Sequence, residues 1–219
     1  MTPEHYNMDF SQRVVMTPKD YGWIASPSAT VTRMPLERAA AESGHTTSLV
    51  TYAAGASFAP HSHPGGEEIF VLEGIFEDES GSYPAGTYLR NPIGTSHRPG
   101  STTGCTLFVK LAQHALEDQQ HLVIDTRSAA FVPGYGGLRV LPLHTHGCVS
   151  TALVWWPAAE RFVPHTHVGG EEIFVLSGTF QDEYGTYPAG TWIRSPHLST
   201  HHPWVDEDTL IFVKTGHLG

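Results

Sequence analysis

Histidine is unusually frequent in this 219-residue chain, with 15 present, and it is a residue type that could do chemistry. His61 and His63 are two residues apart, Glu67 follows a Pro-Gly-Gly turn, and His97 lies further downstream. Residues two apart on a strand point to the same face, so both imidazoles can face one point. Three imidazoles and a carboxylate that converge inside a protein need a cation, because otherwise a charge is desolvated and ring nitrogens compete for donors. The spacing predicts a site for one divalent metal ion.

The same four residues occur a second time at identical spacing. Residues 61–110 align with residues 165–214 without a gap, and 27 of the 50 pairs are identical. An isolated His-x-His pair is a weak signal that is more often found on a surface. Here the substitutions between the two copies leave every predicted ligand in place. We therefore expect two divalent metal ions per chain, one bound by His61, His63, Glu67 and His97 and the other by His165, His167, Glu171 and His201.

The ligand types narrow the metal but do not choose it. Imidazole and carboxylate suit Zn(II) or Fe(II), which we expect first, with Mn(II) and Ni(II) as alternatives. Four protein ligands leave one or two positions open on a six-coordinate ion. An open position admits Lewis-acid or dioxygen chemistry, and it also admits simple coordination of an effector. The predicted partner at the metal is therefore a small-molecule substrate or effector.

The elements that position these residues are short strands. The repeat is as long as a small domain and too long for a solenoid unit, so each copy should fold around its own core. Brief β-branched or apolar runs, at 47–52 and 68–72 in the first copy, are separated by Gly/Pro turns, which is typical of all-β barrels and sandwiches. We predict two tandem domains, 10–112 and 122–219, joined by a polar connector that could form a helical turn.

Composition excludes several classes of partner. The formal net charge is −10, and Lys and Arg never cluster, so we expect no nucleic acid and no anionic membrane surface as a partner. The first 15 residues do not resemble a secretory signal, and no apolar run is long enough to span a bilayer. Cys105 and Cys148 share no short spacing and read as reduced thiols, small core residues of a cytoplasmic protein.

A resemblance to a known family follows from two motifs. The first copy reads Gly55-x5-His61-x-His63-x3-Glu67-x6-Gly74 and then Gly86-x5-Pro92-x-Gly94-x2-His97, which resembles the two signature motifs of the cupin superfamily. More narrowly, the pattern HTH-x-GGEE-x-FVL-x-G-x-F-x-DE-x-G-x-YPAGT is similar to the cupin domain of ChrR-type anti-sigma factors. The resemblance implies two tandem cupin barrels, each a double-stranded β-helix or jelly roll, with a metal near the centre bound by the residues named above.

Two functions from different classes follow from this resemblance. The first is a sensory or regulatory cupin protein, with a sigma factor as its protein partner. In that family a separate zinc-binding domain grips the sigma factor, and its His-x3-Cys-x2-Cys motif is absent here, so we expect only the sensory part. The second is a metal-dependent dioxygenase acting on a small diketone or related organic acid. A third, weaker reading is a small-molecule-binding or isomerase cupin. No catalytic acid, base or substrate clamp can be named, and homo-oligomerisation stays open.

Other chemistry-bearing residues receive less specific predictions. Alternation along a strand points Glu68 and Glu172 away from the ligand glutamates, to the surface or between the barrels. We expect a second His-x-His pair on an exposed strand or loop and two connector histidines in solvent. Two arginines could pair with an anion in the pocket or form salt bridges at its rim. These residues are His144, His146, His114, His121, Arg90 and Arg194.

Overall fold

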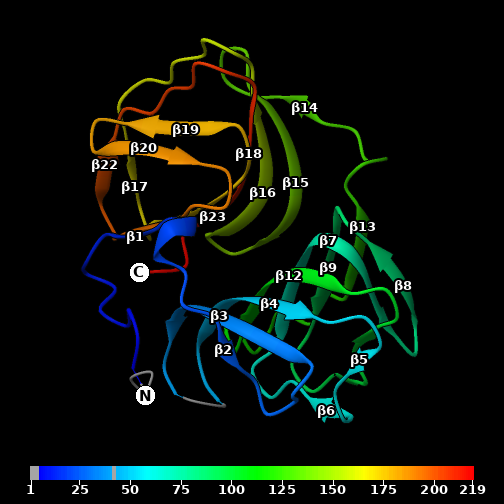
Figure 1. The fold of residues 1–219 in the computed structure, drawn as a ribbon. Coiled ribbons are helices and arrows are strands. Elements are labelled where there is room, and N and C mark those ends of the chain that lie inside the picture. Colours follow the sequence, from blue (N-terminus) through cyan, green and yellow to red (C-terminus); the bar gives the residue numbers. More distant parts are fainter. Residues whose placement is uncertain (1–4, 41–42) are drawn as a thin grey trace. The chain divides into compact units, whose positions relative to one another are not determined.

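The computed structural model describes residues 5–40 and 43–219, and their regular structure is almost entirely strand (Figure 1). The one helical element among them is the 3-10 turn η1 (Pro18–Asp20). The chain divides into two compact units, which we call barrel 1 and barrel 2. Barrel 1 comprises residues 22–128 with the described part of 1–8, and barrel 2 comprises residues 9–21 and 129–219. None of the described helical structure has the length or apolar character needed to cross a membrane.

Barrel 1 is built on a strongly bent antiparallel sheet. Its main path runs, in spatial order, through β13 (Leu122–Asp125), β9 (Thr87–Asn91), β7 (Glu67–Asp78), β12 (Cys105–Leu111), β4 (Thr46–Tyr52), β3 (Val31–Arg38) and β2 (Ile24–Ala25). The far half of the long strand β7 leaves this path and pairs with β8 (Gly81–Pro84) and β11 (Gly100–Ser101), and β11 also pairs with β5 (Ala56–Ser57). A two-stranded ribbon of β6 (His61–Ser62) and β10 (Ser96–His97) completes the barrel.

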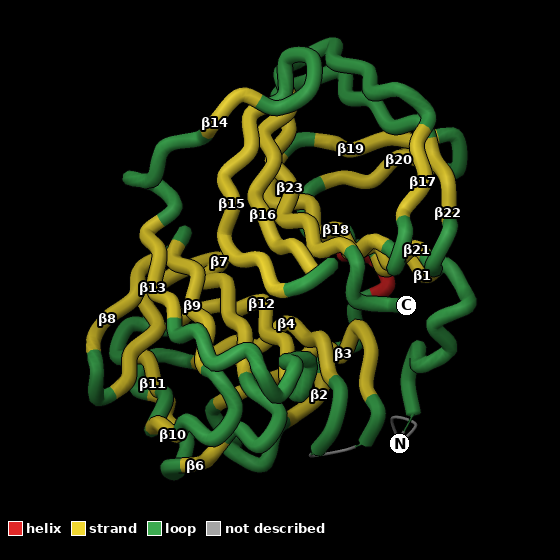
Figure 2. Tube along the Cα trace, turned by 180° about the vertical axis from the view of Figure 1, so that it is seen from behind, coloured by secondary structure: helices red, strands yellow, loops and turns green. Residues whose placement is uncertain are grey.

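Barrel 2 repeats this plan with shorter pieces. Its seven-stranded sheet runs through β1 (Val14–Met16), β21 (Trp192–Ser195), β18 (Glu171–Ser177), β23 (Thr209–Thr215), β16 (Val149–Trp156), β15 (Arg139–His146) and β14 (Val132–Pro133). Strands β15, β16 and β23 lie side by side in both views of the chain (Figure 2). Two ribbons close the barrel: β17 (His165–His167) with β22 (Ser199–His201), and β19 (Thr179–Asp182) with β20 (Gly185–Pro188).

The core of each barrel comes from alternate residues of its strands. In barrel 1, Ile69 and Val71 join one buried cluster with Leu107 and Val109 of the neighbouring strand β12. Glu67 has the same parity as Ile69 and Val71, so it points to the same interior. Ile173 and Val175 fill the corresponding place in barrel 2. Each predicted ligand glutamate therefore faces the barrel interior, and the next inward-facing residues of the same strand form the hydrophobic core.

The edge strand of each barrel comes from the segment ahead of the other repeat. Strand β1 lies at the start of the first predicted domain, yet it pairs with β21 of barrel 2, with Val14 opposite Arg194. Strand β13 lies at the start of the second predicted domain and pairs with β9 of barrel 1, with Leu122 opposite Arg90. The compact units thus differ from the expected ranges 10–112 and 122–219 at these two segments. Strands pair through backbone hydrogen bonds, which do not depend on side-chain identity. Comparing the sequences of the two repeats therefore could not reveal these two pairings.

The connector between the two copies contains turns and no helix within the described structure. Asp118 and His114 of this segment both contact Arg90, so His114 is not the solvated residue that the sequence suggested. His121 is exposed, as expected. The connector therefore belongs structurally to barrel 1, which it covers before it supplies β13.

Candidate metal centres

The four predicted ligands of barrel 1 meet at one point. His61 lies on β6 and His97 on β10, directly opposite each other in the ribbon, while Glu67 begins β7. The Nε2 atoms of His63 and His97 lie 3.4 and 3.6 Å from Oε2 of Glu67. One potential ligand atom from each of the four residues lies within 4.8 Å of all the others. Three of the residues are buried and His61 is exposed, so the site opens to solvent on the His61 side.

Barrel 2 has the same arrangement. His165 and His167 lie on β17, His201 lies opposite His165 on β22, and Glu171 begins β18. Oε2 of Glu171 lies 3.4 Å from Nε2 of His167 and 3.5 Å from Nε2 of His201. The potential ligand atoms again lie within 4.8 Å of one another. His165 is half-buried, so this centre is slightly more enclosed than the first.

Four of the atoms that would contact an ion are buried and make no hydrogen bond. They are Nε2 of His63, Nε2 of His97, Nε2 of His167 and Oε2 of Glu171. Buried polar atoms without partners are costly and rare in folded proteins. Nitrogen and oxygen ligands that hold a metal at about 2.0–2.2 Å lie roughly 3 to 3.5 Å apart, which is close to the distances between these atoms. The residues fit a divalent ion in both barrels.

Backbone carbonyls fix which ring nitrogen of two histidines faces the site. Nδ1 of His61 lies 3.1 Å from the carbonyl oxygen of Ala59, and Nδ1 of His165 lies 2.9 Å from that of Val163. A carbonyl oxygen only accepts, so Nδ1 must carry the proton and donate it. Nε2 is then the nitrogen with a free lone pair, which is the form that binds a metal.

An aspartate, half-buried in barrel 1 and buried in barrel 2, plays the same part for the third histidine of each set. Nδ1 of His97 lies 3.3 Å from Oδ2 of Asp78, and Nδ1 of His201 lies 3.4 Å from Oδ2 of Asp182. Such a carboxylate orients the imidazole and strengthens it as a metal ligand. Sequence reasoning did not single out these aspartates, although the Asp-Glu pair that contains them recurs in both copies.

The two centres differ in what surrounds the ligand glutamate. Asn91 donates from Nδ2 to Oε2 of Glu67 at 3.0 Å. The residue at the same rung of barrel 2 is Ser195, and Oε2 of Glu171 makes no hydrogen bond. Burial raises the pKa of Glu171 to about 7, against the opposing charges of His201 and Arg13.

Burial acts in the opposite direction on the histidines, because it disfavours their charged form. It lowers the pKa of His167 to about 3, with further lowering from His201 and His165. The pKa of His63 is lowered for the same reason, although Glu67 opposes the shift. In both centres the buried imidazole is therefore neutral at physiological pH, which is the state a metal ligand requires.

Glu68 and Glu172 point away from the sites, as strand alternation predicted, but the prediction that they could lie on the surface is wrong. Their side chains are buried. Glu68 accepts a hydrogen bond from the Tyr88 hydroxyl at 2.6 Å, and Glu172 accepts one from Nε1 of Trp192 at 2.7 Å. Both faces of these strands are covered, so alternation gives the direction of a side chain without giving its exposure.

Two further expectations are corrected. His144 is buried, because a bulge between Pro142 and His144 shifts the register of β15. Cys148 is exposed, because it lies in the turn between β15 and β16, whereas Cys105 is buried as expected.

The sequence left two roles open for Arg90 and Arg194, pairing with an anion in the pocket or forming salt bridges at its rim. Arg90 forms a buried ion pair with Asp118, and Arg194 donates to the backbone oxygen of Asp9 at 2.9 Å. Arg90 thus helps to attach the connector that leads into β13 to barrel 1, and Arg194 helps to attach the segment that leads into β1 to barrel 2.

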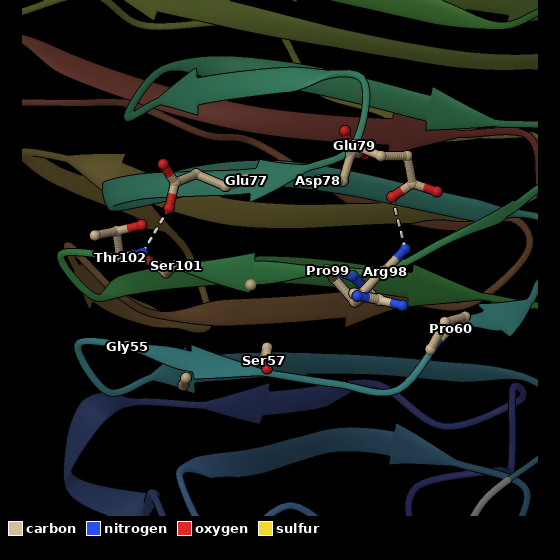
Figure 3. Close-up of a pocket in the computed structure, with 12 residues that line it drawn as sticks. Gly55, Ser57, Pro60, Glu77, Asp78, Glu79, Arg98, Pro99, Ser101 and Thr102 are labelled. Atoms are coloured by element: carbon tan, nitrogen blue, oxygen red, sulfur yellow. Dashed lines mark hydrogen bonds between the residues drawn. The ribbon is translucent and has the colours of Figure 1, made fainter.

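An open groove of about 670 Å³ lies on barrel 1 beside the centre (Figure 3). It crosses β7, β11 and β5, with the carboxylate of Glu77 accepting from the backbone N–H of Thr102 at 2.5 Å and that of Glu79 from the N–H of Arg98 at 2.8 Å. Asp78 lies between these two glutamates and is the residue that contacts His97. The groove therefore adjoins the centre through Asp78.

The fold and these two centres define a bicupin, and comparison with known families makes the assignment narrower. The family model described as the ChrR cupin-like domain matches residues 11–115 and again residues 119–219. The chain belongs to this family, with one copy of the domain in each repeat. No curated protein matches the chain in sequence.

Solved structures share the fold at low sequence identity. A presumed dioxygenase from Nostoc punctiforme superposes with a TM-score of 0.78 and 14% identity, over 95% of this chain and 84% of that one. A bacterial pirin from Escherichia coli in complex with nickel(II) gives 0.68 and 14%, over 93% and 98%. An oxalate decarboxylase from Lactobacillus farciminis, in a formate complex, gives 0.67 and 12%, over 93% and 86%. These likenesses show the cupin fold.

Proposed function

We propose that each barrel binds one divalent metal ion and that the protein is the sensory part of a ChrR-like regulatory system. The observation that carries the metal proposal is the convergence of buried ring nitrogens that make no hydrogen bond, each beside the carboxylate of Glu67 or Glu171. The family supplies the regulatory half of the proposal. Zn(II) or Fe(II) is the ion we expect, with Mn(II) and Ni(II) to be tested beside them.

The residues around each site fit a sensor that coordinates an effector. When bound, the ion would supply Lewis acidity and one or two exchangeable coordination positions. The exposed side of His61 gives a small molecule a path to the barrel 1 site, while Ala59 and Asp78 keep the imidazoles oriented whether or not an effector is present. We propose a cytoplasmic setting and a sigma factor as the protein that receives the signal.

A second candidate is a metal-dependent dioxygenase acting on a small diketone or related organic acid. The open side of the site at His61 favours it, because substrate and oxygen both need access. The structural likeness to a presumed dioxygenase gives the same hint at the level of fold. A dioxygenase needs coordination positions on the metal for its reactants, and the three-His, one-Glu set leaves them.

One experiment separates the two candidates. Protein made without chelators is analysed for its elements and then screened for oxygen uptake with small diketones and aromatic acids. Bound zinc and no uptake support the sensor, whereas bound iron with uptake supports the dioxygenase. The control is the double variant His63→Ala, His167→Ala, which should lose metal from both barrels and, with it, any uptake.

A further inference from the structure

The surroundings of the two centres carry different charges, although their ligands are identical. In barrel 2, NH2 of Arg13 lies 2.9 Å from Oδ2 of Asp182, the carboxylate that orients His201. The same NH2 group lies 2.8 Å from the hydroxyl of Tyr187, which itself donates to Asp182 at 2.6 Å. The guanidinium of Arg13 therefore partly neutralises the Asp182 carboxylate, whose negative charge would otherwise act fully on His201.

Barrel 1 has no such cation. Arg13 stands one residue before Val14, which pairs with Arg194, and the residue in the same position of barrel 1 is His121, one residue before Leu122. Asp78 accepts hydrogen bonds from the Tyr83 hydroxyl and from backbone N–H groups, and no Arg or Lys among the described residues pairs with it. The carboxylate beside His97 keeps its whole charge.

These contacts lead to a simple charge count. Counting the ligand glutamate and the aspartate that contacts the third histidine, barrel 1 holds two carboxylates, Glu67 and Asp78, whose charge a divalent ion neutralises. Glu79 also acts on His97, but its counterpart Glu183 acts on His165, so this pair does not distinguish the barrels. In barrel 2 the count is Glu171, Asp182 and Arg13, so a bound divalent ion leaves a net positive charge. Positive charge close to a cation site weakens binding. Asp182 is buried and Arg13 is half-buried, so solvent screens this charge only in part.

The surroundings of the two ligand glutamates also differ, and this difference likewise favours tighter metal binding in barrel 1. Glu67 is oriented by Asn91, while Glu171 stands opposite Ser195 and its inward oxygen makes no hydrogen bond. Groups that orient a ligand typically change metal affinity by 10- to 100-fold. We infer that the two centres are unequal: barrel 1 holds its divalent ion more tightly than barrel 2, and Arg13 together with the pair Asn91 and Ser195 sets the difference. This inference rests on the proposed metal binding.

Two cations of barrel 1 need separate treatment. The guanidinium of Arg33 lies 5.8 Å from the centre of the Phe58 ring, and its charge acts on Tyr52 together with that of Glu67. Arg98 follows His97 directly, and the residue at its place in barrel 2 is His202. The Arg98 side chain is exposed and lies at the groove (Figure 3), whereas the His97 side chain is buried. Its charge is therefore screened by solvent, which makes Arg98 a matched control for Arg13.

The test uses two full-length variants with one site each. The double change His63→Ala, His97→Ala leaves barrel 2, and His167→Ala, His201→Ala leaves barrel 1. The affinity of each for Zn(II) is measured at pH 8 by competition with a chromophoric chelator, and we expect barrel 1 to bind at least roughly tenfold more tightly. Equal affinities, or tighter binding in barrel 2, would overturn the inference. Failure of both proteins to bind any divalent ion would overturn the proposed metal binding itself.

Substitutions then assign the cause. In the barrel 2 protein, Arg13→Gln should raise the affinity roughly tenfold, and Arg13→Lys should restore the weaker binding. A purely structural role for Arg13 gives the opposite sign, because losing the partner of Asp182 would loosen His201 and weaken binding. Arg98→Gln in the barrel 1 protein should change the affinity less than about twofold.

The reciprocal exchange tests the second difference. Asn91→Ser should weaken the barrel 1 protein and Ser195→Asn should tighten the barrel 2 protein, each by roughly tenfold. Thermal unfolding of each metal-free variant shows whether it is folded. If Arg13→Gln does not fold, Ser195→Asn and Arg13→Lys still decide the matter: an unchanged Ser195→Asn affinity, or a tightened Arg13→Lys affinity, counts against the inference.

Discussion

The inner and outer surfaces of the two barrels have diverged to different extents. Inside, the ligand atoms occupy matching positions, with Glu67 and Glu171 at equal distances from His63 and His167. Outside, the row of residues across the small sheet differs completely. In barrel 1 the row is Glu77, Gly100 and Ser57, and in barrel 2 it is Gln181, Trp204 and Arg161.

The outer row of barrel 1 lines its groove. The guanidinium of Arg161 lies 5.6 Å from the centre of the Trp204 ring, so in barrel 2 two large side chains cover the sheet. Gly100 has no side chain at the equivalent place and lines the groove of about 670 Å³. The contrast teaches that the duplication kept the residues that converge on each centre, while packing outside the barrel was free to change.

The largest effect should come from removing the ligands themselves. His97→Ala should reduce the metal content from two ions per chain to one, because three ligands cannot replace the full set in barrel 1. At a metal concentration 1,000-fold above Kd, each ion stabilises its folded site by about 4 kcal/mol, so the thermal midpoint of barrel 1 should fall. Elemental analysis and calorimetry check this, and an unchanged metal content would contradict the ligand assignment.

The next effect separates adjacent residues of one strand. Glu67→Gln keeps the size of the side chain and removes its charge, so metal affinity at barrel 1 should weaken by roughly tenfold or more. Glu68→Gln should leave metal affinity nearly unchanged, because Glu68 points to the other face and accepts from Tyr88. Competition titrations with the barrel 2 site disabled measure both.

The same contrast should hold for Glu171 and Glu172. If the outward glutamate of either pair empties its site while the inward one does not, the register through the turn before the strand is wrong by one residue.

Acid should release the metal from both barrels. Protons compete with the ion for imidazole, whose ordinary pKa is about 6.5, so metal content should fall between about pH 6 and 4. In metal-free protein the lowered pKa of His167 acts on stability in a defined direction. The unfolded chain binds this proton below about pH 6.5 and the folded chain does not until about pH 3. Stability is thus present above pH 6.5 and is lost as the pH falls.

Elemental analysis after equilibration at stepped pH values, with unfolding followed in parallel, checks this dependence. Full retention of metal at pH 4 would argue against imidazole ligation.

The smallest effects should come from the outer row. Trp204→Gly should destabilise barrel 2 by about 1–2 kcal/mol, since the half-buried indole loses its contacts. Gly100→Trp should change the stability of barrel 1 by less than about 1 kcal/mol, because a new Cβ meets the Ala56 oxygen at 3.0 Å but the ring then covers the groove. Metal content should stay at two ions in both variants. A lost ion would show that the outer row supports the centres after all.

The sequence predicts the fold and the convergence of the ligands because both depend on local spacing. Strand alternation places His61 with His63, and a Gly-Gly pair precedes the ligand glutamate in both copies. Ligation itself stays a prediction. The same reasoning could not find Arg13, because it reaches its centre through the pairing of β1 with β21, between segments about 180 residues apart in the chain.

The sequence also could not predict that the outward-facing residues of these strands are buried. Period-two alternation places Glu68 and Lys110 opposite the interior, but it does not show whether that face is covered. Both are buried in the structure. Their exposure depends on what packs against the outer face of the sheet, which the pattern within one strand does not encode.

The central claim, one divalent ion in each barrel, is tested most directly by anomalous diffraction from crystals of protein purified without chelators. Data collected on both sides of the zinc and iron absorption edges should show two anomalous peaks per chain. Each should lie about 2.0–2.2 Å from the Nε2 atoms of its three histidines and from Glu67 or Glu171. A chain with no peak at either centre, or with peaks bound only by other residues, would contradict the account.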